Sequence, residues 1–314
     1  MNPKKELIIS SEGNGLEWGK KVIDFLIKKA LPETNIKYEM SLDCDAIILS
    51  HFINDEALWN KQDKKYIYWS GEHYDVFTHS KAVSSISLLT TIKEKEEKEL
   101  GHSPAKKILY VPYTLYSPYL YKERKYNNDI NERKYLLAYC SSNPTKMRED
   151  LYNAFVIAVG EDSDLCHALG KCCGKHKSTQ KTIEGHWEDG VLIDNYKNYK
   201  FIFALENSQV NGYVTEKLLN AFYSGAIPIY WGSSNINDLF NKDAFINVAD
   251  FESIDECVDH IINMSPDELQ KIQNEPIYNE KSEIIHLMDE EFYAKNGNKT
   301  RDDYVKAMRD FLLA

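Results

Sequence analysis

Short apolar runs alternate with amphipathic segments along most of this chain, and polar or turn-forming residues bound each run. Apolar runs of this length are typical of strands that are buried on both faces of a parallel sheet. The segment 17–29 places its apolar residues on one face at helical spacing, which predicts an amphipathic helix. The strands expected in the first part of the chain are 7–10, 46–52, 66–70, 86–90 and 108–112. This alternation predicts a parallel α/β domain.

A polar and highly charged stretch separates these elements from a second alternating set. Residues 122–134, KERKYNNDINERK, show no core pattern and are the best candidate for a linker. The second set begins with an expected strand at 135–140, and 314 residues leave room for two domains of ordinary size. We therefore expect an N-terminal domain over residues 1–130 and a C-terminal domain over residues 131–314, with helices at its end.

Two of these later helices are predicted from the chemistry of their first turns. Ser253 and Glu256 have the spacing of a capping box, in which each side chain accepts a hydrogen bond from the other residue's backbone N–H. Ser265 and Glu268 have the same spacing, and Pro266 stands at the first helical position, where proline is favoured. Both helices are expected to close the second domain.

The segment 201–231 predicts a strand, a loop, a helix and a second strand in that order. The apolar run 201–205 ends at polar residues, and Thr215 is placed to cap the helix that follows. Gly225 is expected to end this helix, because glycine readily adopts the left-handed conformation of a helix terminus, and 226–231 is the second strand. Polar side chains thus gather at the carboxyl end of a parallel strand, the edge where open α/β sheets bind ligands.

Glu216 and Lys217, in the first turn of this helix, are candidate ligand-binding residues. Unpaired N–H groups and a partial positive charge at the helix start, together with the Lys217 ammonium, suit a diphosphate. A carboxylate repels phosphate, so Glu216 is better suited to two hydroxyls of a ribose. The alternative is that both are solvated first-turn charges and that Tyr213 is an ordinary core residue. Spacing alone leaves both hypotheses open.

Composition narrows the classes of partner and the compartment. The formal net charge of -11, from 38 basic and 49 acidic residues, argues against a nucleic-acid surface, which needs a basic face. No apolar run is long enough for a transmembrane helix, and the N-terminus lacks the apolar core of a secretory signal. The 6 cysteines are scattered, which favours reduced thiols. These features predict a cytoplasmic protein without a transmembrane segment.

Several short motifs stand in order between residues 206 and 251. They are Glu206-Asn207-Ser208, Tyr213-Val214-Thr215-Glu216-Lys217, Ile227-Pro228-Ile229-Tyr230-Trp231-Gly232, Phe245-Ile246-Asn247-Val248 and Asp250-Phe251. This series resembles the signature of the α1,3-fucosyltransferases, glycosyltransferase family 10, and a weaker likeness to bacterial members covers residues 60–285. Because the N-terminus lacks the apolar core of a secretory signal, the resemblance favours a soluble member of the bacterial or viral type. Together with the alternation of strands and helices, the resemblance implies the GT-B architecture, in which two Rossmann-like domains face each other across a cleft.

The resemblance also implies the residues that bind the donor. Arg148 stands at the spacing of an arginine that grips the donor diphosphate, a role that suits its bidentate fork. Lys217 would neutralise the departing diphosphate, and Glu216 would hold the ribose. Asn207 and Tyr213 would line the donor pocket.

Glu72 is the candidate general base. It follows Gly71 after the expected strand 66–70 and matches a Gly-Glu that in bacterial relatives carries the proposed base. An inverting displacement in one step needs a carboxylate that takes the proton of the acceptor hydroxyl. His73 is the alternative base, because an imidazole has the better matched pKa, and a third possibility is that Glu72 is a loop residue paired with a neighbour.

The activity implied by the resemblance is an inverting transfer of L-fucose from GDP-fucose, in an α1,3 linkage, to a glycan that contains N-acetylglucosamine or glucose. The expected partners are this nucleotide-sugar donor, bound by the C-terminal domain, and an oligosaccharide or glycoconjugate acceptor, bound by the N-terminal domain. No cofactor or metal is required, since two cationic side chains and a helix start can stabilise the leaving charge, and a divalent cation would be at most a non-essential stimulator. The alternatives are a related transferase that uses another nucleotide sugar and a non-catalytic nucleotide-sugar-binding protein.

Two further motifs are weaker. Asp43-Cys44-Asp45 and Asp162-Ser163-Asp164 resemble the Asp-X-Asp of metal-dependent transferases over three residues only. Gly13-Asn14-Gly15 hints at a dinucleotide-binding loop, but Trp18 occupies the position of the third glycine of that pattern. We therefore disfavour both a metal site and a dehydrogenase.

Overall fold

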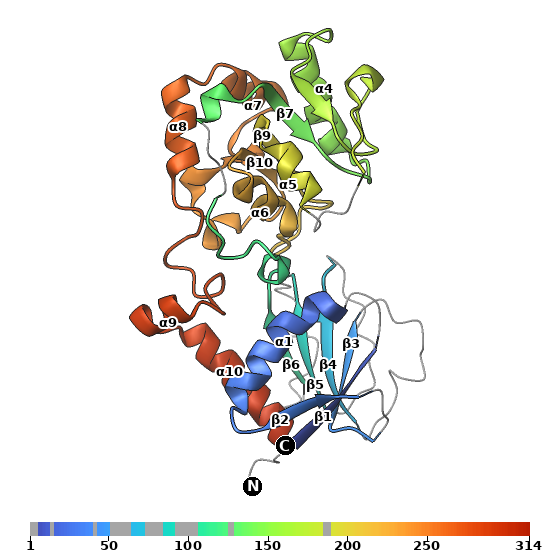
Figure 1. Cartoon of the computed structure of the whole chain (residues 1–314), viewed down its shortest axis with the longest axis vertical. Coiled ribbons are helices and arrows are strands. Elements are labelled where there is room, and N and C mark those ends of the chain that lie inside the picture. Colours follow the sequence, from blue (N-terminus) through green and yellow to red (C-terminus); the bar gives the residue numbers. More distant parts are fainter. Residues whose placement is uncertain are drawn as a thin grey trace. The chain divides into compact units, whose positions relative to one another are not determined.

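The structure is a computed structural model that describes residues 6–12, 16–39, 43–50, 64–72, 84–91, 106–124, 129–184 and 190–314. Its internal contacts divide the chain into two compact units, each with a parallel sheet (Figure 1). Unit 1 comprises Met1–Ser117, Val210–Tyr213 and Lys281–Ala314, and unit 2 comprises Pro118–Gln209 and Val214–Glu280. The predicted α/β class with parallel sheets is confirmed.

Unit 1 is built on a six-stranded sheet in the order β2-β1-β3-β4-β5-β6, as far as the described residues go. Its strands are β1 (Glu6–Glu12), β2 (Asn35–Tyr38), β3 (Ala46–Ser50), β4 (Lys65–Ser70), β5 (Ser84–Leu89) and β6 (Lys106–Tyr110). Helix α1 (Leu16–Ala30) buries Val22, Ile23, Leu26 and Ile27, which share one helical face, so the predicted amphipathic helix is present. Every residue of β3 is buried, as expected for a central parallel strand.

The C-terminal helices belong to unit 1. Helices α9 (Glu290–Asn296) and α10 (Lys299–Leu313) follow the chain's return to this unit, and α10 packs against α1 and β5. The Tyr304 hydroxyl donates to the Tyr110 carbonyl at 2.7 Å, and Lys65 Nζ donates to the Leu312 carbonyl at 2.9 Å. The predicted division at residue 130, with the terminal helices in the second domain, therefore differs from the structure, because α10 packs against α1 and β5 of unit 1.

Among its described residues, unit 2 is built on a five-stranded sheet in the order β11-β10-β9-β7-β8. Its strands are β7 (Tyr135–Tyr139), β8 (Cys166–Ala168), β9 (Tyr199–Leu205), β10 (Ile227–Trp231) and β11 (Ile246–Asn247). Its helices are α4 (Lys146–Val159), α5 (Val191–Tyr196), α6 (Glu216–Tyr223), α7 (Ile254–Ile262) and α8 (Pro266–Asn274). The predicted strand–loop–helix–strand unit is thus present as β9, α6 and β10.

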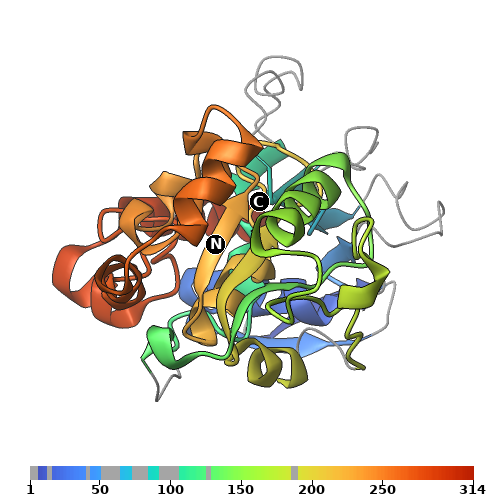
Figure 2. The ribbon, with the colours of Figure 1, turned by 90° about the horizontal axis from the view of Figure 1, so that it is seen from above.

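Helices cover both faces of the second sheet. Along β9, Phe201, Phe203 and Leu205 pack in the core that includes α4 and α7, whereas Ile202 packs in the core that includes α5 and α6. This alternation follows from the period of two in a strand, and it makes unit 2 a three-layer α/β sandwich. Figure 2 shows α4 and α5 on opposite sides of the strands.

The predicted helix ends can be compared with the observed caps. Ser265 and Glu268 form the complete capping box, since each side chain accepts from the other residue's backbone N–H. Ser253 caps α7 by accepting from the Glu256 N–H at 3.1 Å, but the Glu256 carboxylate accepts from the Glu252 N–H instead. The box predicted at Ser253 and Glu256 is therefore only half formed. Among the described residues, no helix combines the length and the apolarity that a membrane crossing requires.

Candidate functional site

Unit 2 contains a pocket of about 680 Å³ at the carboxyl edge of its sheet. Its walls are the segments that directly follow β7, β8 and β9, together with one face of α5 and the first turns of α4 and α6. Four of the five residues predicted to bind the donor line it, namely Arg148, Asn207, Glu216 and Lys217. The structure thus brings together side chains that are far apart in the sequence, at the edge where parallel α/β sheets bind ligands.

The start of α6 is held by a buried carboxylate. Glu206 follows β9 directly, is 0% exposed, and accepts the backbone N–H of Thr215 at 2.7 Å. The Thr215 hydroxyl donates to the same carboxylate, with 3.0 and 2.9 Å to its two oxygens. Thr215 occupies the N-cap position, but its side chain makes no cap hydrogen bond, so the predicted capping role is wrong. The physical reason is that the hydroxyl donates to the buried Glu206 carboxylate and its oxygen accepts from Lys217 Nζ, not from a backbone N–H of the first turn.

Lys217 lies against this network. Its Nζ donates to Thr215 Oγ1 at 2.9 Å and lies 3.2 Å from Glu216 Oε1 and 3.5 Å from Glu206 Oε2. Burial lowers the pKa of Lys217, but the Glu216 and Glu206 carboxylates raise it by more, so the net pKa lies above the usual lysine value. Its side chain keeps 25% of its surface exposed. Lys217 is therefore a protonated cation in the pocket wall.

For the Glu206 carboxyl, burial and the neighbouring opposite charge shift the pKa in the reverse directions from those for Lys217. Burial raises the pKa of its carboxyl above the ordinary range, although Lys217 and the two bonds from Thr215 lower it. The carboxylate is compensated by an ammonium, an N–H and an O–H group, which is what an acid with no solvent contact requires.

Arg148, in the first turn of α4, also lines the pocket and has 1% of its surface exposed. Its Nε donates to the Leu205 carbonyl at 3.1 Å, and Nη2 donates to the same oxygen. Its Nη1 donates to Ser141 Oγ at 3.0 Å and to the Asn143 carbonyl at 2.9 Å. Arg148 thus ties the end of β9 to the loop after β7 and places a permanent positive charge beside the pocket.

The remaining predicted residues lie elsewhere. Tyr213 is buried in the segment assigned to unit 1 and is not among the residues that line this pocket. Glu72 follows β4 of unit 1 after Gly71 and is half-buried. Its N–H donates to Ser70 Oγ at 3.3 Å and its carbonyl accepts from Thr90 Oγ1 at 3.0 Å, so its backbone position is fixed. The alternative base, His73, lies outside the described residues.

Sequence reasoning missed two residues of this region. Glu206 was assigned only to the polar residues that end the strand, because a single sequence shows neither its complete burial nor its contact with Thr215. Asn220 lines the pocket from α6 and is 2% exposed, and its Oδ1 is buried without a hydrogen-bond partner. The available signal was a polar residue on the apolar side of the helix, four positions after Glu216.

One aspartate of each weak Asp-X-Asp match makes a polar contact within the fold. Asp45 Oδ2 accepts from the Ile8 N–H at 2.9 Å, which links the start of β3 to β1. Asp164 Oδ1 lies 2.8 Å from His167 Nε2, and this contact lowers the pKa of the carboxyl. Asp45 and Asp164 therefore have structural roles beside β3 and β8.

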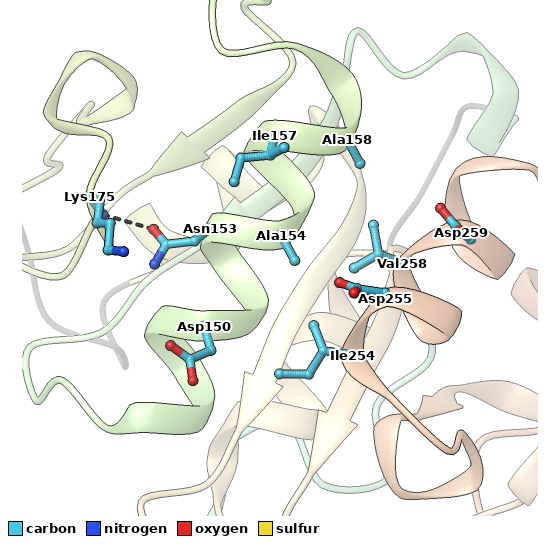
Figure 3. A pocket seen from close by; sticks show the side chains of 10 residues that line it. All are labelled: Asp150, Asn153, Ala154, Ile157, Ala158, Lys175, Ile254, Asp255, Val258 and Asp259. Atoms are coloured by element: carbon cyan, nitrogen blue, oxygen red, sulfur yellow. Dashed lines mark hydrogen bonds between the residues drawn. The ribbon is translucent and has the colours of Figure 1, made fainter.

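A second hollow, of about 600 Å³, lies between α4 and α7 on the surface of unit 2 (Figure 3). Ala154 on α4 and Val258 on α7 face each other between the two helices, and Asp150, Asp255 and Asp259 are among the residues that line it. It contains none of the predicted residues, and its aspartates outnumber its lysine. A surface of this kind repels a diphosphate, so the pocket beside Lys217 is the better site for one.

Comparison with known proteins gives a family match over the segment that contains this pocket. Residues 130–273 match the family model described as "Glycosyltransferase family 10 (fucosyltransferase) C-term". The chain is 31% identical over 208 residues to a putative fucosyltransferase of Acanthamoeba polyphaga mimivirus, which covers 62% of this chain and 34% of that protein. It is 51% identical over 63 residues to an alpha-(1,3)-fucosyltransferase of Helicobacter pylori, over 20% of this chain and 13% of the relative. The chain thus spans about a third or less of the length of these curated relatives.

The structure is also similar to a crystal structure of an alpha1,3-fucosyltransferase with GDP-fucose. The TM-score is 0.61 at 18% sequence identity, over 100% of this chain and 93% of that one. At this identity the likeness shows the fold, which is the predicted GT-B class of two Rossmann-like domains.

Proposed function

We propose that this chain is a member of glycosyltransferase family 10, the fucosyltransferases, whose model matches residues 130–273, and that it transfers L-fucose from GDP-fucose to a glycan hydroxyl. The observation that carries this proposal is the pocket of unit 2, where Lys217, Arg148 and the start of α6 gather positive charge around one space. A nucleoside diphosphate is the ligand whose charge fits that space. The GDP-fucose in the similar fucosyltransferase structure supports the choice of nucleotide and sugar.

In the proposed reaction Lys217 and the first N–H groups of α6 bind the diphosphate and stabilise the charge that develops as it leaves. Arg148 contributes mainly through its fixed charge, because most of its N–H groups already bind Leu205, Ser141 and Asn143. Favourable charges that are already in place lower the barrier, since no reorganisation is needed when the bond breaks. We infer that this arrangement works without a metal, and that a divalent cation is at most a stimulator.

The neutral parts of the donor are assigned to the polar residues of the site. Glu216 accepts hydrogen bonds from the ribose hydroxyls, with 15% of its side chain exposed. Asn207 lines the same pocket and supplies an amide for the donor, and Tyr213 remains a proposed lining residue. Unit 2 would thus serve the donor and unit 1 the acceptor.

Glu72 is the proposed general base. Its carboxylate takes the proton of the acceptor hydroxyl while the oxygen attacks the anomeric carbon and GDP leaves from the opposite face, which inverts the configuration. The fixed backbone at Ser70 and Thr90 gives the carboxylate a defined origin at the end of β4. The proposed product is an α1,3-linked fucose on N-acetylglucosamine or glucose, and the proposed compartment is the cytoplasm.

The test is a transfer assay with GDP-fucose, N-acetyllactosamine and EDTA. Glu72→Gln should reduce the rate at least about a hundredfold, the usual contribution of a general base, while GDP affinity stays near normal. Glu33→Gln, at an exposed position between α1 and β2, is the matched control and should keep the rate. Full activity in Glu72→Gln would move the base assignment to His73. Transfer only from a uridine nucleotide sugar, or only with added metal, would overturn the donor assignment or the mechanism.

A further inference from the structure

Glu206 places a carboxylate beside a site proposed for an anion, which is an unexpected position for a negative charge. It is 0% exposed and is not among the residues that line the pocket, so it reaches a ligand only through other side chains. Its own N–H donates to the Trp231 carbonyl at 2.8 Å, which fixes its backbone to the end of β10. A buried charge of this kind is expensive unless it is fully paired, so its retention requires an explanation.

The Glu206 carboxylate makes polar contacts with Thr215 and Lys217 at the start of α6. The carboxylate accepts the Thr215 N–H at 2.7 Å, which fixes the residue just before the helix. It also accepts the Thr215 hydroxyl, whose oxygen in turn accepts from Lys217 Nζ at 2.9 Å. Lys217 Nζ lies 3.5 Å from Glu206 itself. One buried acid thus orients both the helix start and the lysine ammonium.

We infer that Glu206 is a positioning residue that aims Lys217 and the start of α6 at the donor diphosphate; this inference rests on the proposed function. Glu206 and Thr215 hold the ammonium from the protein side, and its third contact is the Glu216 carboxylate in the pocket wall. Glu216, which is partly exposed, is the carboxylate that a diphosphate can displace from Lys217, whereas the buried Glu206 keeps its contacts. The lysine then needs little reordering when the nucleotide binds, which favours affinity.

The test compares Glu206→Gln with Glu149→Gln. Glutamine keeps the size of the side chain and can still accept the Thr215 N–H, but it removes the charge that faces Lys217. Glu149 is a matched control in the same unit, because its carboxylate also accepts one hydroxyl, from Tyr139 at 2.6 Å, and one backbone N–H, from Gly174 at 2.8 Å. It lies outside the pocket lining.

Two measurements separate positioning from simple stabilisation. Calorimetry with GDP and with guanosine should show about tenfold weaker GDP binding in Glu206→Gln and guanosine binding within about twofold of wild type, because only the diphosphate uses Lys217. Acylation of Lys217, read by mass spectrometry without nucleotide, should be at least about threefold faster in Glu206→Gln, since the ammonium has lost a counter-charge. Glu149→Gln should leave both readouts unchanged even where it lowers the melting temperature.

The outcomes distinguish this inference from the proposed function. Equal GDP affinity and equal Lys217 labelling in Glu206→Gln and wild type would overturn the positioning role. Faster labelling in a protein whose wild type binds no GDP would overturn the proposed donor and leave the positioning role standing. If Glu206→Gln does not fold, Thr215→Val removes the hydroxyl that links Glu206 to Lys217 at nearly constant volume. It should then weaken GDP binding and leave guanosine binding near that of wild type, and unchanged GDP affinity would refute the inference.

Discussion

Gly232→Ala adds one methyl group and should disturb the site because that methyl group would clash with the buried Glu206 side chain. Gly232 follows β10, and a Cβ at this position would lie 2.6 Å from Glu206 Cγ and 2.6 Å from Tyr230 Oη. Ordinary contacts between such atoms are about 3.5–4.0 Å, so each neighbour would have to move by roughly 1 Å. Neither has room, because Glu206 and Tyr230 are both 0% exposed.

The expected cost follows from overpacking. Forcing an extra methyl group into a filled interior typically costs about 1–3 kcal/mol, which corresponds to a fall in Tm of roughly 2–12 °C for a domain of 150–250 residues. A displaced Glu206 also loosens its hold on Thr215 and Lys217. We therefore expect GDP binding to weaken at least about threefold, in addition to the loss of stability.

The assay is thermal unfolding together with GDP titration, and Tyr230→Phe provides the control. In the Tyr230→Phe background one of the two clashing atoms is gone, so Gly232→Ala should cost roughly 1 kcal/mol less than it does in wild type, a coupling that a double-mutant cycle measures. A Tm within about 1 °C of wild type and an unchanged GDP affinity would show that the region behind the site is not packed as described.

Two further predictions concern helix caps and pH. Ser265→Ala removes the centre of the complete capping box of α8 and should destabilise the protein by about 0.5–2 kcal/mol in urea unfolding, more than Ser253→Ala, whose box is half formed; an equal loss would contradict the cap assignment. The hydroxyl and N–H of Thr300 hold the pKa of Glu283 below its usual range. A depressed folded-state pKa gives stability that is present above the unfolded-state pKa of about 4.3 and is lost as pH falls through the folded-state value, so Glu283→Gln should lose less stability than wild type below about pH 5. Identical Tm profiles between pH 3 and 7 would refute that linkage.

Sequence patterns predicted the elements whose signals are local. Helix α1 was predictable because Val22, Ile23 and Leu26 recur at helical spacing, and the central strands were predictable because they are apolar throughout. The short strand β2 was not predicted, since its four residues alternate between exposed and half-buried and form the edge of the sheet. The terminal helices were assigned to the second domain because nothing in their sequence indicates which sheet they cover.

In the site, the residues that were predicted are those with a local signal or a match to a family motif. Lys217 and Glu216 were predicted from their place beside a helix start, and the family resemblance added Arg148 and Asn207. The resemblance gave no indication that the Arg148 fork binds the Leu205 carbonyl, 57 residues away in the sequence, because this contact exists only once β9 and α4 have packed. The role of Glu206 was missed for the same reason, since a single sequence shows neither its complete burial nor its contact with Thr215.

The most direct test of the account is calorimetric titration of GDP in EDTA into wild type and Lys217→Met, with Lys197→Met as the control. Lys197 is an exposed lysine of the same unit that pairs with Asp194 outside the pocket. Wild type and Lys197→Met should bind GDP equally, and Lys217→Met should bind it at least about tenfold more weakly, because a charge-assisted contact to the diphosphate is lost. Equal affinity in Lys217→Met, or wild-type binding that appears only with uridine nucleotides or added metal, would contradict the proposed donor site.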